Sequence, residues 1–387
     1  MEQANEEIKS RLSEKALAEN ERSKKALLEA CATEQSVLVV GAGLSNRAGY
    51  PLWSPLLEQL RGLVDSLSTD CNAPFIKSQE AEDDDLAYAD ELRHYIEIRA
   101  NVNRYYGFLH DTFKPNGGYD PLHDQLMALP FLGIVTTNYD PLLDDALRRQ
   151  YPEITDTHFV VDHDHIPDLR RFIANLRKKN LSNRQIAHLH GRYDMPSRTI
   201  LTKSDYRRIY DSRFDESQKQ RLLDIVNYKA DPAETIQHIE TILPGWTLHR
   251  KFLWSLLSSR SAVFLGFGMK DPYFLEMLKT VTDDLWLWND PAHFAIMPRL
   301  PNDDTAAQRA LQFRSKYGVA VVFYDIHDGN HTAVETLIQD MSSACGITPR
   351  PTVPLTPEPG QVAKVNEGRR ALFKKINEQT RQHSRPL

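Results

Sequence analysis

Four short segments of the chain carry residues suited to binding or cleaving a nucleotide. The first is Gly41-Ala42-Gly43-Leu44-Ser45, which follows the apolar run 36–40. Glycines in a turn between a strand and a helix let the backbone approach a phosphate closely, and the helix N-terminus offers unpaired N–H groups. Ser45 adds a hydroxyl donor. The pattern predicts a phosphate-binding turn, with a tight turn that binds no ligand as the alternative.

This turn departs from the glycine pattern of hydride-transferring dehydrogenases. Asn46 stands where the third glycine would be, and the next glycine is Gly49. No acidic residue about 20 positions further on stands out as a ribose ligand at a strand end. A nicotinamide-dependent dehydrogenase is therefore disfavoured.

The second segment is Thr136-Thr137-Asn138-Tyr139-Asp140-Pro141. Asp140 before a proline has the form of a helix N-cap, and that structural role is enough to account for it. It does not account for Asn138. A carboxamide at the end of a buried strand can hold a ribose hydroxyl or a water without introducing charge.

The third segment is Ala187-His188-Leu189-His190-Gly191. In a strand the two histidines would lie on one face, with His190 nearer the carboxyl end and Gly191 leaving room beside it. An imidazole accepts a proton near neutral pH, which suits a general base. A structural histidine is the commoner alternative. Two histidines could also bind a metal, but no cysteine or carboxylate at ligand spacing supports one.

A fourth segment, Gly266-Phe267-Gly268-Met269-Lys270-Asp271-Pro272, repeats the glycine turn and the Asp-Pro helix start. It is interpreted as a second close approach of backbone to a nucleotide, with a plain turn as the alternative.

These segments follow short apolar runs that alternate with helical patterns. The runs are 36–40, 131–136, 185–189, 261–267, 293–297 and 319–324, and the predicted crossover helices are 54–67, 141–149, 272–282, 305–317 and 332–344. Continuous apolar strands separated by helices predict an α/β fold, a Rossmann-like parallel sheet with helices on both faces. Ligands in such sheets bind beyond the carboxyl ends of the strands, where the four segments fall.

The rest of the chain is assigned around this sheet. Residues 1–33 form a charged helix, and residues 34–345 form the sheet domain with helical insertions at about 68–120 and 205–258, which make a smaller second layer. Residues 346–360 are a Pro-rich linker, and residues 361–387 are a basic tail.

Composition narrows the class of protein. The net charge of −6 disfavours autonomous nucleic-acid binding, because phosphate neutralisation drives that affinity. Three isolated cysteines, Cys31, Cys71 and Cys345, form neither a disulfide framework nor a zinc site, which is typical of a cytoplasmic protein. No apolar run approaches the roughly 18 residues of a membrane span, so no membrane association is expected.

Taken in order, the motifs resemble the sirtuin-like family, and specifically its bacterial branch in antiphage defence. They are Gly41-Ala42-Gly43-x-Ser45 with Gly49, Thr137-Asn138-Tyr139-Asp140, Leu189-His190-Gly191, and Gly266-Phe267-Gly268 with Asp271-Pro272. Ile200-Leu201-Thr202-Lys203-Ser204-Asp205-Tyr206 also resembles a segment of that branch. The resemblance spans roughly residues 34–345.

The resemblance implies a role for each motif. Gly41, Ala42, Gly43 and Ser45 would cradle the NAD phosphates, with Gly49 and Thr137 beside them, and Gly266, Phe267, Gly268 and Asp271 would line the adenosine side. Asn138 would position the ribose and the attacking water, His190 would be the general base, and Asp140 would orient the ribose or stabilise positive charge.

The resemblance also implies an activity. The four-cysteine zinc module of deacylating sirtuins is absent, since no cysteine lies between Cys71 and Cys345. The expected reaction is hydrolysis of NAD, bound as substrate, to nicotinamide and ADP-ribose, without a metal. A non-catalytic NAD or ADP-ribose sensor, a protein ADP-ribosyltransferase or deacylase, and a nuclease accessory remain alternatives. A homo-oligomer and a hexameric HerA-type ATPase, a DNA translocase, are the implied partners.

Overall fold

Seven parallel strands form the centre of the molecule in the order β3-β4-β2-β1-β5-β6-β7. The computed structural model describes residues 2–68, 75–151, 160–162, 165–177, 184–210, 247–287, 290–300, 303, 305–326 and 331–347. The strands are β1 (Ser36–Val40), β2 (Ile134–Thr136), β3 (Val160–Asp162), β4 (Ile186–His188), β5 (Ser261–Leu265), β6 (His293–Arg299) and β7 (Val319–Asp325). All six predicted strands are present. β3 was not predicted.

The strand register brings four chain turns to one edge of the sheet. Val40 of β1 pairs with Thr136 of β2 and with Leu265 of β5, and Thr136 pairs with His188 of β4. The loops that follow these four strands therefore begin at the same level. β1 is buried along its whole length, as expected for a central strand covered on both faces.

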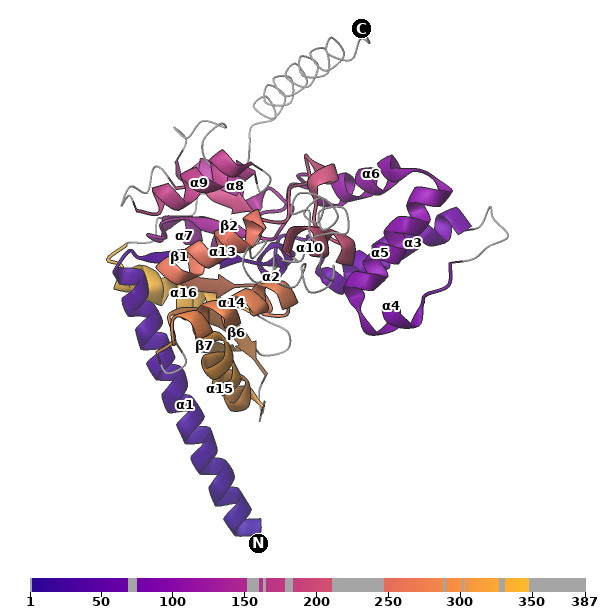
Figure 1. Ribbon diagram of the computed structural model, residues 1–387. Helices are drawn as coiled ribbons and strands as arrows, with labels where there is room; N and C mark the ends of the chain where they lie inside the picture. Colours follow the sequence, from indigo (N-terminus) through magenta and orange to yellow (C-terminus); the bar gives the residue numbers. More distant parts are fainter. Residues whose placement is uncertain are drawn as a thin grey trace, which may run out of the picture. The chain divides into compact units, whose positions relative to one another are not determined.

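Helices cover both faces of the sheet, which confirms the predicted α/β architecture (Figure 1). One apolar core includes side chains of α9 (Ile166–Asn175), α13 (Leu248–Ser259) and α14 (Pro272–Asp284). The other includes α7 (Pro121–Ala128), α8 (Leu142–Gln150), α16 (Ala333–Ala344) and the end of α1 (Glu2–Ala32). α15 (Ala306–Tyr317) packs beside β7 and α14.

A separate helical layer has a core of its own. α3 (Trp53–Ser68), α5 (Asp85–Arg99) and α6 (Val102–Phe113), with the short α4 (Gln79–Asp83), lie together to one side of the sheet (Figure 1). Their apolar side chains meet Tyr139 and Tyr193 from the loops after β2 and β4. The predicted crossover helix at 54–67 is observed as α3, but its apolar face belongs to this layer and not to the sheet.

The predicted insertion at about 205–258 is described only at its two ends. α10 (Lys203–Tyr210) and α13 are helical, and residues 211–246 lie outside the described residues. The basic tail predicted for 361–387 and all but the first two residues of the predicted linker also lie outside them. None of the described helices is long and apolar enough to cross a membrane.

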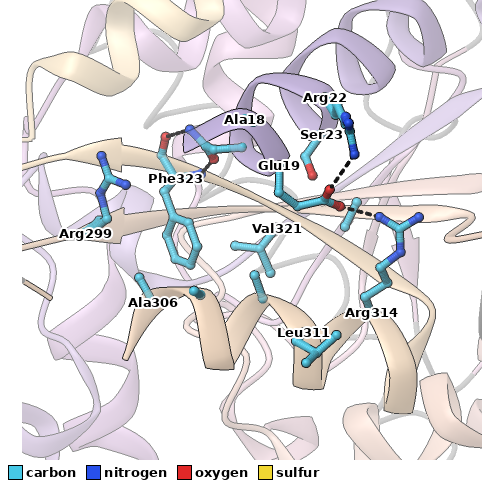
Figure 2. Close-up of a pocket in the computed structure, with 14 residues that line it drawn as sticks. Ala18, Glu19, Arg22, Ser23, Arg299, Ala306, Leu311, Arg314, Val321 and Phe323 are labelled. Atoms are coloured by element: carbon cyan, nitrogen blue, oxygen red, sulfur yellow. Dashed lines mark hydrogen bonds and ion pairs between the residues drawn. The ribbon is translucent and has the colours of Figure 1, made fainter. Parts of the chain in front are cut away.

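α1 covers the open edge of the sheet at β7. The Asn20 side chain accepts a hydrogen bond from the Phe323 N–H at 2.7 Å and donates one to the Phe323 carbonyl at 3.2 Å, as a neighbouring strand would. Between α1, β7 and α15 lies a groove of about 730 Å³, largely apolar, with Glu19 between Arg22 and Arg314 at its rim (Figure 2). None of the predicted site residues lines this groove.

Candidate active site

The loops after β1, β2 and β4 converge on a small cavity of about 110 Å³. Its walls are formed by two groups of residues. Polar residues from the strand ends and α10 are Ser45, Thr137, Asn138, Asp140, His190 and Tyr206, and largely apolar residues are Ala42, Tyr50, Pro51, Leu52, Trp53, Leu56, Phe113 and Tyr139. All three residues predicted to be catalytic therefore face one cavity, beside an apolar and aromatic wall.

A chain of hydrogen bonds orients the Asn138 carboxamide. Asn138 Nδ2 donates to Ser45 Oγ at 2.8 Å, and the Ser45 hydroxyl is hydrogen-bonded in turn to the Asp140 carboxylate. A hydroxyl has one proton to donate, so donation to Asp140 leaves Ser45 Oγ to accept from Asn138. Asn138 Oδ1 is then left as a buried acceptor with no hydrogen-bond partner among the described residues. Such an atom is suited to a ligand hydroxyl or a water.

Asp140 lies just before α8 and in the wall of the cavity. Its Oδ1 accepts a hydrogen bond from the Leu142 N–H at 3.1 Å at the start of α8, and the residue also lines the cavity. Burial raises the pKa of Asp140, although the hydrogen bonds from Ser45 and Leu142 act in the opposite direction. α8 begins at Leu142, one residue later than predicted, with Pro141 at the boundary.

His190 is surrounded by tyrosines of α10. Its Nε2 lies 2.9 Å from the Tyr210 hydroxyl, and its Nδ1 lies 3.4 Å from the Tyr206 hydroxyl. The Tyr206 hydroxyl donates to Asp271 Oδ2 at 2.9 Å, so towards His190 it can only accept. Nδ1 therefore carries a proton, and in the neutral imidazole Nε2 accepts from the Tyr210 hydroxyl. This tautomer leaves Nε2 as the basic nitrogen.

His188 does not share a face with His190, and the prediction that it would is wrong. β4 ends at His188, so the two-residue alternation of a strand does not extend to His190. His188 contacts Asp144 of α8 on one side of the sheet. His190 contacts the α10 tyrosines, which belong to the core on the other side.

The two glycine turns pack against each other. The Gly43 N–H donates to the Gly266 carbonyl at 2.9 Å, and a Cβ built on Gly41 would lie 2.4 Å from Phe267 Cα. Gly266 has a φ of +64°, and a Cβ there would lie 2.5 Å from the Leu44 nitrogen. Contact between the turns is therefore sufficient to require these glycines. α2 (Ala42–Asn46), which follows the first turn, has only five residues.

The predicted binding residues are only partly brought together. Ala42, Ser45 and Thr137 line the cavity with the three predicted catalytic residues, whereas Gly41, Gly43, Gly49, Gly266, Phe267, Gly268 and Asp271 do not. Asp271 caps α14 through Oδ1 and reaches the site indirectly, through the Tyr206 hydroxyl. Phosphate binding by the first glycine turn and adenosine binding by the second stay predictions.

Sequence reasoning gave no role to Tyr206 or Tyr210. Both are buried, and they lie four residues apart, which places them on one face of α10. That spacing was the available signal. It was not informative alone, because only the fold brings α10 to His190. In the part of the chain that the structure describes, no group of three or more His, Cys, Asp or Glu side chains is arranged to hold a metal ion.

Comparison with known proteins identifies the central part of this fold. A family model described as a SIR2-like domain matches residues 132–322. The chain carries a SIR2-like domain. The matched segment of this domain contains Asn138, Asp140, His190 and the second glycine turn, whereas the Gly41–Gly43 turn lies before it.

The SIR2-like chain is also similar to curated bacterial proteins. It is 24% identical over 279 residues to the NAD(+) hydrolase ThsA of Enterococcus faecium, covering 70% of this chain and 45% of the relative. It is 26% identical over 197 residues to the NAD(+) hydrolase ThsA of Bacillus cereus (strain MSX-D12), covering 50% and 35%. Defense-associated sirtuin 2 of Bacillus subtilis is 27% identical over 122 residues, 32% of this chain and 11% of the relative. The chain thus spans less than half the length of these relatives.

Proposed function

We propose that the cavity binds the nicotinamide-ribose end of NAD and that the protein hydrolyses NAD to nicotinamide and ADP-ribose. The observation that carries this proposal is the buried Asn138 Oδ1, an acceptor without a partner among the described residues, in the same cavity as His190. A carboxamide acceptor and an imidazole base are the two groups needed to align a hydroxyl nucleophile and take its proton. The names of the relatives support NAD as the substrate.

In the proposed reaction, the bond between the ribose C1′ and the nicotinamide nitrogen breaks, and its electron pair neutralises the pyridinium ring. A water oxygen bonds to C1′ and loses its proton to His190 Nε2. Asn138 Oδ1 holds the water or a ribose hydroxyl in line. Asp140 lies in the same cavity, where its carboxylate would stabilise the positive charge that develops on the ribose ring.

The small volume of the cavity limits how NAD can bind. Cavities that enclose small ligands usually measure about 300–1,000 Å³, and this one measures about 110 Å³. It can take a nicotinamide ring or a ribose, but not a whole dinucleotide. The proposal therefore requires side chains to move when NAD enters. Tyr210 must leave His190 Nε2 or pass the proton onward, because its hydroxyl occupies the basic nitrogen.

The biological role proposed for this activity is depletion of NAD in the cytoplasm of an infected bacterium, as antiphage defence. The support is the similarity to a protein named as a defense-associated sirtuin and to the ThsA hydrolases.

The test is to incubate the purified protein with NAD and to separate the products by chromatography. We expect nicotinamide and ADP-ribose in equal amounts, and a rate that falls at least about 100-fold in Asn138→Ala. Asn20→Ala is the matched control, because Asn20 holds β7 and lies outside the cavity. A parent rate in Asn138→Ala would refute the site. Tight NAD binding without products would indicate a sensor, and ADP-ribose attached to protein would indicate a transferase.

We further propose, from the family resemblance, that the protein acts as a homo-oligomer with a HerA-type ATPase. Size-exclusion chromatography with light scattering, with and without the co-expressed ATPase, tests both. Only a monomer in both samples would refute the proposal.

A further inference from the structure

A buried group of charges lies directly behind Asn138 and outside the cavity. His188 is 2% exposed, and its Nδ1 lies 3.1 Å from the backbone carbonyl oxygen of Asn138. Its Nε2 lies 3.0 Å from Asp144 Oδ1, and Asp144 has no exposed surface. Neither His188 nor Asp144 lines the cavity. Both residues can therefore affect the cavity only indirectly, through the contact of His188 with Asn138.

The partners of His188 indicate its charge. A carbonyl oxygen can only accept, so Nδ1 donates to Asn138. If Asp144 is a carboxylate, its oxygen also accepts, and Nε2 must donate as well. An imidazole that donates from both nitrogens is an imidazolium.

The surroundings of Asp144 favour the carboxylate form. The Arg192 guanidinium lies 3.5 Å from Asp144 Oδ2, on the side opposite His188. Burial would raise the pKa of Asp144, but His188 and Arg192 together lower it below its ordinary value. Arg192 also pairs with Asp194 at 3.1 Å.

The backbone of Asn138 needs such support. The paired residues of β2 end at Thr136, so the sheet holds neither the N–H nor the carbonyl group of Asn138. The Thr136 hydroxyl accepts from the Asn138 N–H at 3.0 Å, and His188 holds the carbonyl. Two side chains thus hold the Asn138 backbone where the strand ladder stops, and the carboxamide held by Ser45 projects from this backbone.

We propose that His188, as an imidazolium held by Asp144, is a positioning residue that fixes the Asn138 backbone and thereby aligns the Asn138 carboxamide for the reaction. This inference deepens the proposed function and rests on it. His188 does not touch the substrate. In this proposal it acts through a charge-assisted hydrogen bond to a main-chain carbonyl, which is stronger than a neutral one.

The first experiment measures kcat and KM for NAD in three variants. His188→Gln removes the charge, and we expect kcat to fall about 10- to 100-fold with KM changed less than about threefold, since a small misplacement of a catalytic group costs this much. His188→Lys keeps a cation with several donors, and we expect kcat within about fivefold of the parent. His293→Gln is the matched control, because His293 is also a buried histidine. His293 lies in β6 and accepts a hydrogen bond from the Ala262 N–H of β5, whereas Asn138 follows β2, which is separated from β5 by β1.

The second experiment reads the charge without any substrate. Nitrogen NMR of the full-length protein labelled in its histidines, with the His188 signals assigned by comparison with His188→Lys, reports the protons on each ring nitrogen. We expect both nitrogens of His188 to be protonated at neutral pH. One unprotonated nitrogen would overturn the proposal, even if His188→Gln fails to fold.

The outcomes separate the two proposals. If the parent protein releases no nicotinamide from NAD, the proposed function is wrong whatever the spectrum shows, and the positioning role falls with it. If the parent is active and folded His188→Gln matches its kcat, only the positioning role is wrong. Equal loss of kcat in folded His188→Gln and His188→Lys would also overturn it, because charge would then not matter.

Discussion

The two histidines at the end of β4 lie two residues apart, and their surroundings differ in almost every respect. His190 lines a cavity and contacts tyrosine hydroxyls, which in the neutral imidazole place the proton on Nδ1 and leave Nε2 as the base. His188 lies behind the cavity between a carboxylate and a carbonyl oxygen, both of which are hydrogen-bond acceptors. The difference teaches that the partners of an imidazole, and not its place in a motif, decide whether it can accept a proton.

The comparison is tested most strongly at His190. We expect His190→Gln to lower kcat for NAD about 10²- to 10⁴-fold, the range over which a general base contributes. His293→Gln is the control for loss of a buried imidazole. Steady-state nicotinamide release measures both. If His190→Gln keeps a rate within about threefold of the parent, His190 is not the base. The proposed difference in role between His190 and His188 would then be wrong.

The next largest effect is expected at Asp144, and it concerns stability. Asp144→Asn leaves His188 charged and buried without its partner, which should lower the free energy of unfolding by about 3–5 kcal/mol. Urea unfolding measures this loss. The double variant with His188→Gln removes both charges, so we expect it to recover part of the stability. Additive losses in the double variant would show that the two side chains are not coupled.

A third prediction concerns a buried histidine without a carboxylate beside it. Burial lowers the pKa of His293 to about 4, below the ordinary value of 6.5. The unfolded chain binds a proton at this residue near pH 6.5 and the folded chain does not, so stability is lost as the pH falls from 6.5 towards 4.

The expected loss attributable to His293 between pH 7.5 and pH 5 is about 2 kcal/mol. Urea unfolding at both pH values measures it, and His293→Gln should remove this part of the pH dependence. An unchanged pH dependence in that variant would contradict the assignment of His293 as neutral.

The smallest effect is expected at the tyrosines that distinguish the His190 site. Tyr206→Phe removes the hydroxyl between His190 Nδ1 and Asp271, so the tautomer is no longer held, and we expect kcat to fall about tenfold. Tyr210→Phe removes only the hydroxyl on Nε2, which the substrate must displace, and we expect kcat within about threefold of the parent. The reverse order of the two effects would show that Tyr210, and not Tyr206, supports the base.

The parallel sheet could be predicted because its strands are continuous apolar runs. β1 was predicted at both ends, and α16 was predicted to within one residue, since apolar periodicity and turn residues are local signals. β3 was missed, and its pairing with β4 is seen only in the tertiary structure. α3 was predicted as a helix, but the sequence did not show that its apolar face packs in the second layer. An amphipathic pattern shows that a helix has an apolar face, but not which element covers that face.

The same limit applies to the site. Asn138, Asp140 and His190 could be chosen from the sequence because each follows an apolar run, and the carboxyl ends of parallel strands meet at one edge. The first glycine turn was predicted to bind the phosphates and the second to line the adenosine side, and the structure shows the two turns in contact with each other. A glycine in a turn indicates close approach, but the sequence does not say what approaches it.

The sequence by itself therefore determined the class of fold and the polar residues at the strand ends, because both depend on local patterns of burial and turn chemistry. Only the tertiary structure decided that α10 brings Tyr206 and Tyr210 to His190 and that α8 brings Asp144 to His188. The physical reason is that the protonation of an imidazole depends on atoms within hydrogen-bond distance. For His190 these atoms come from α10, and for His188 they come from α8 and from the loop after β2.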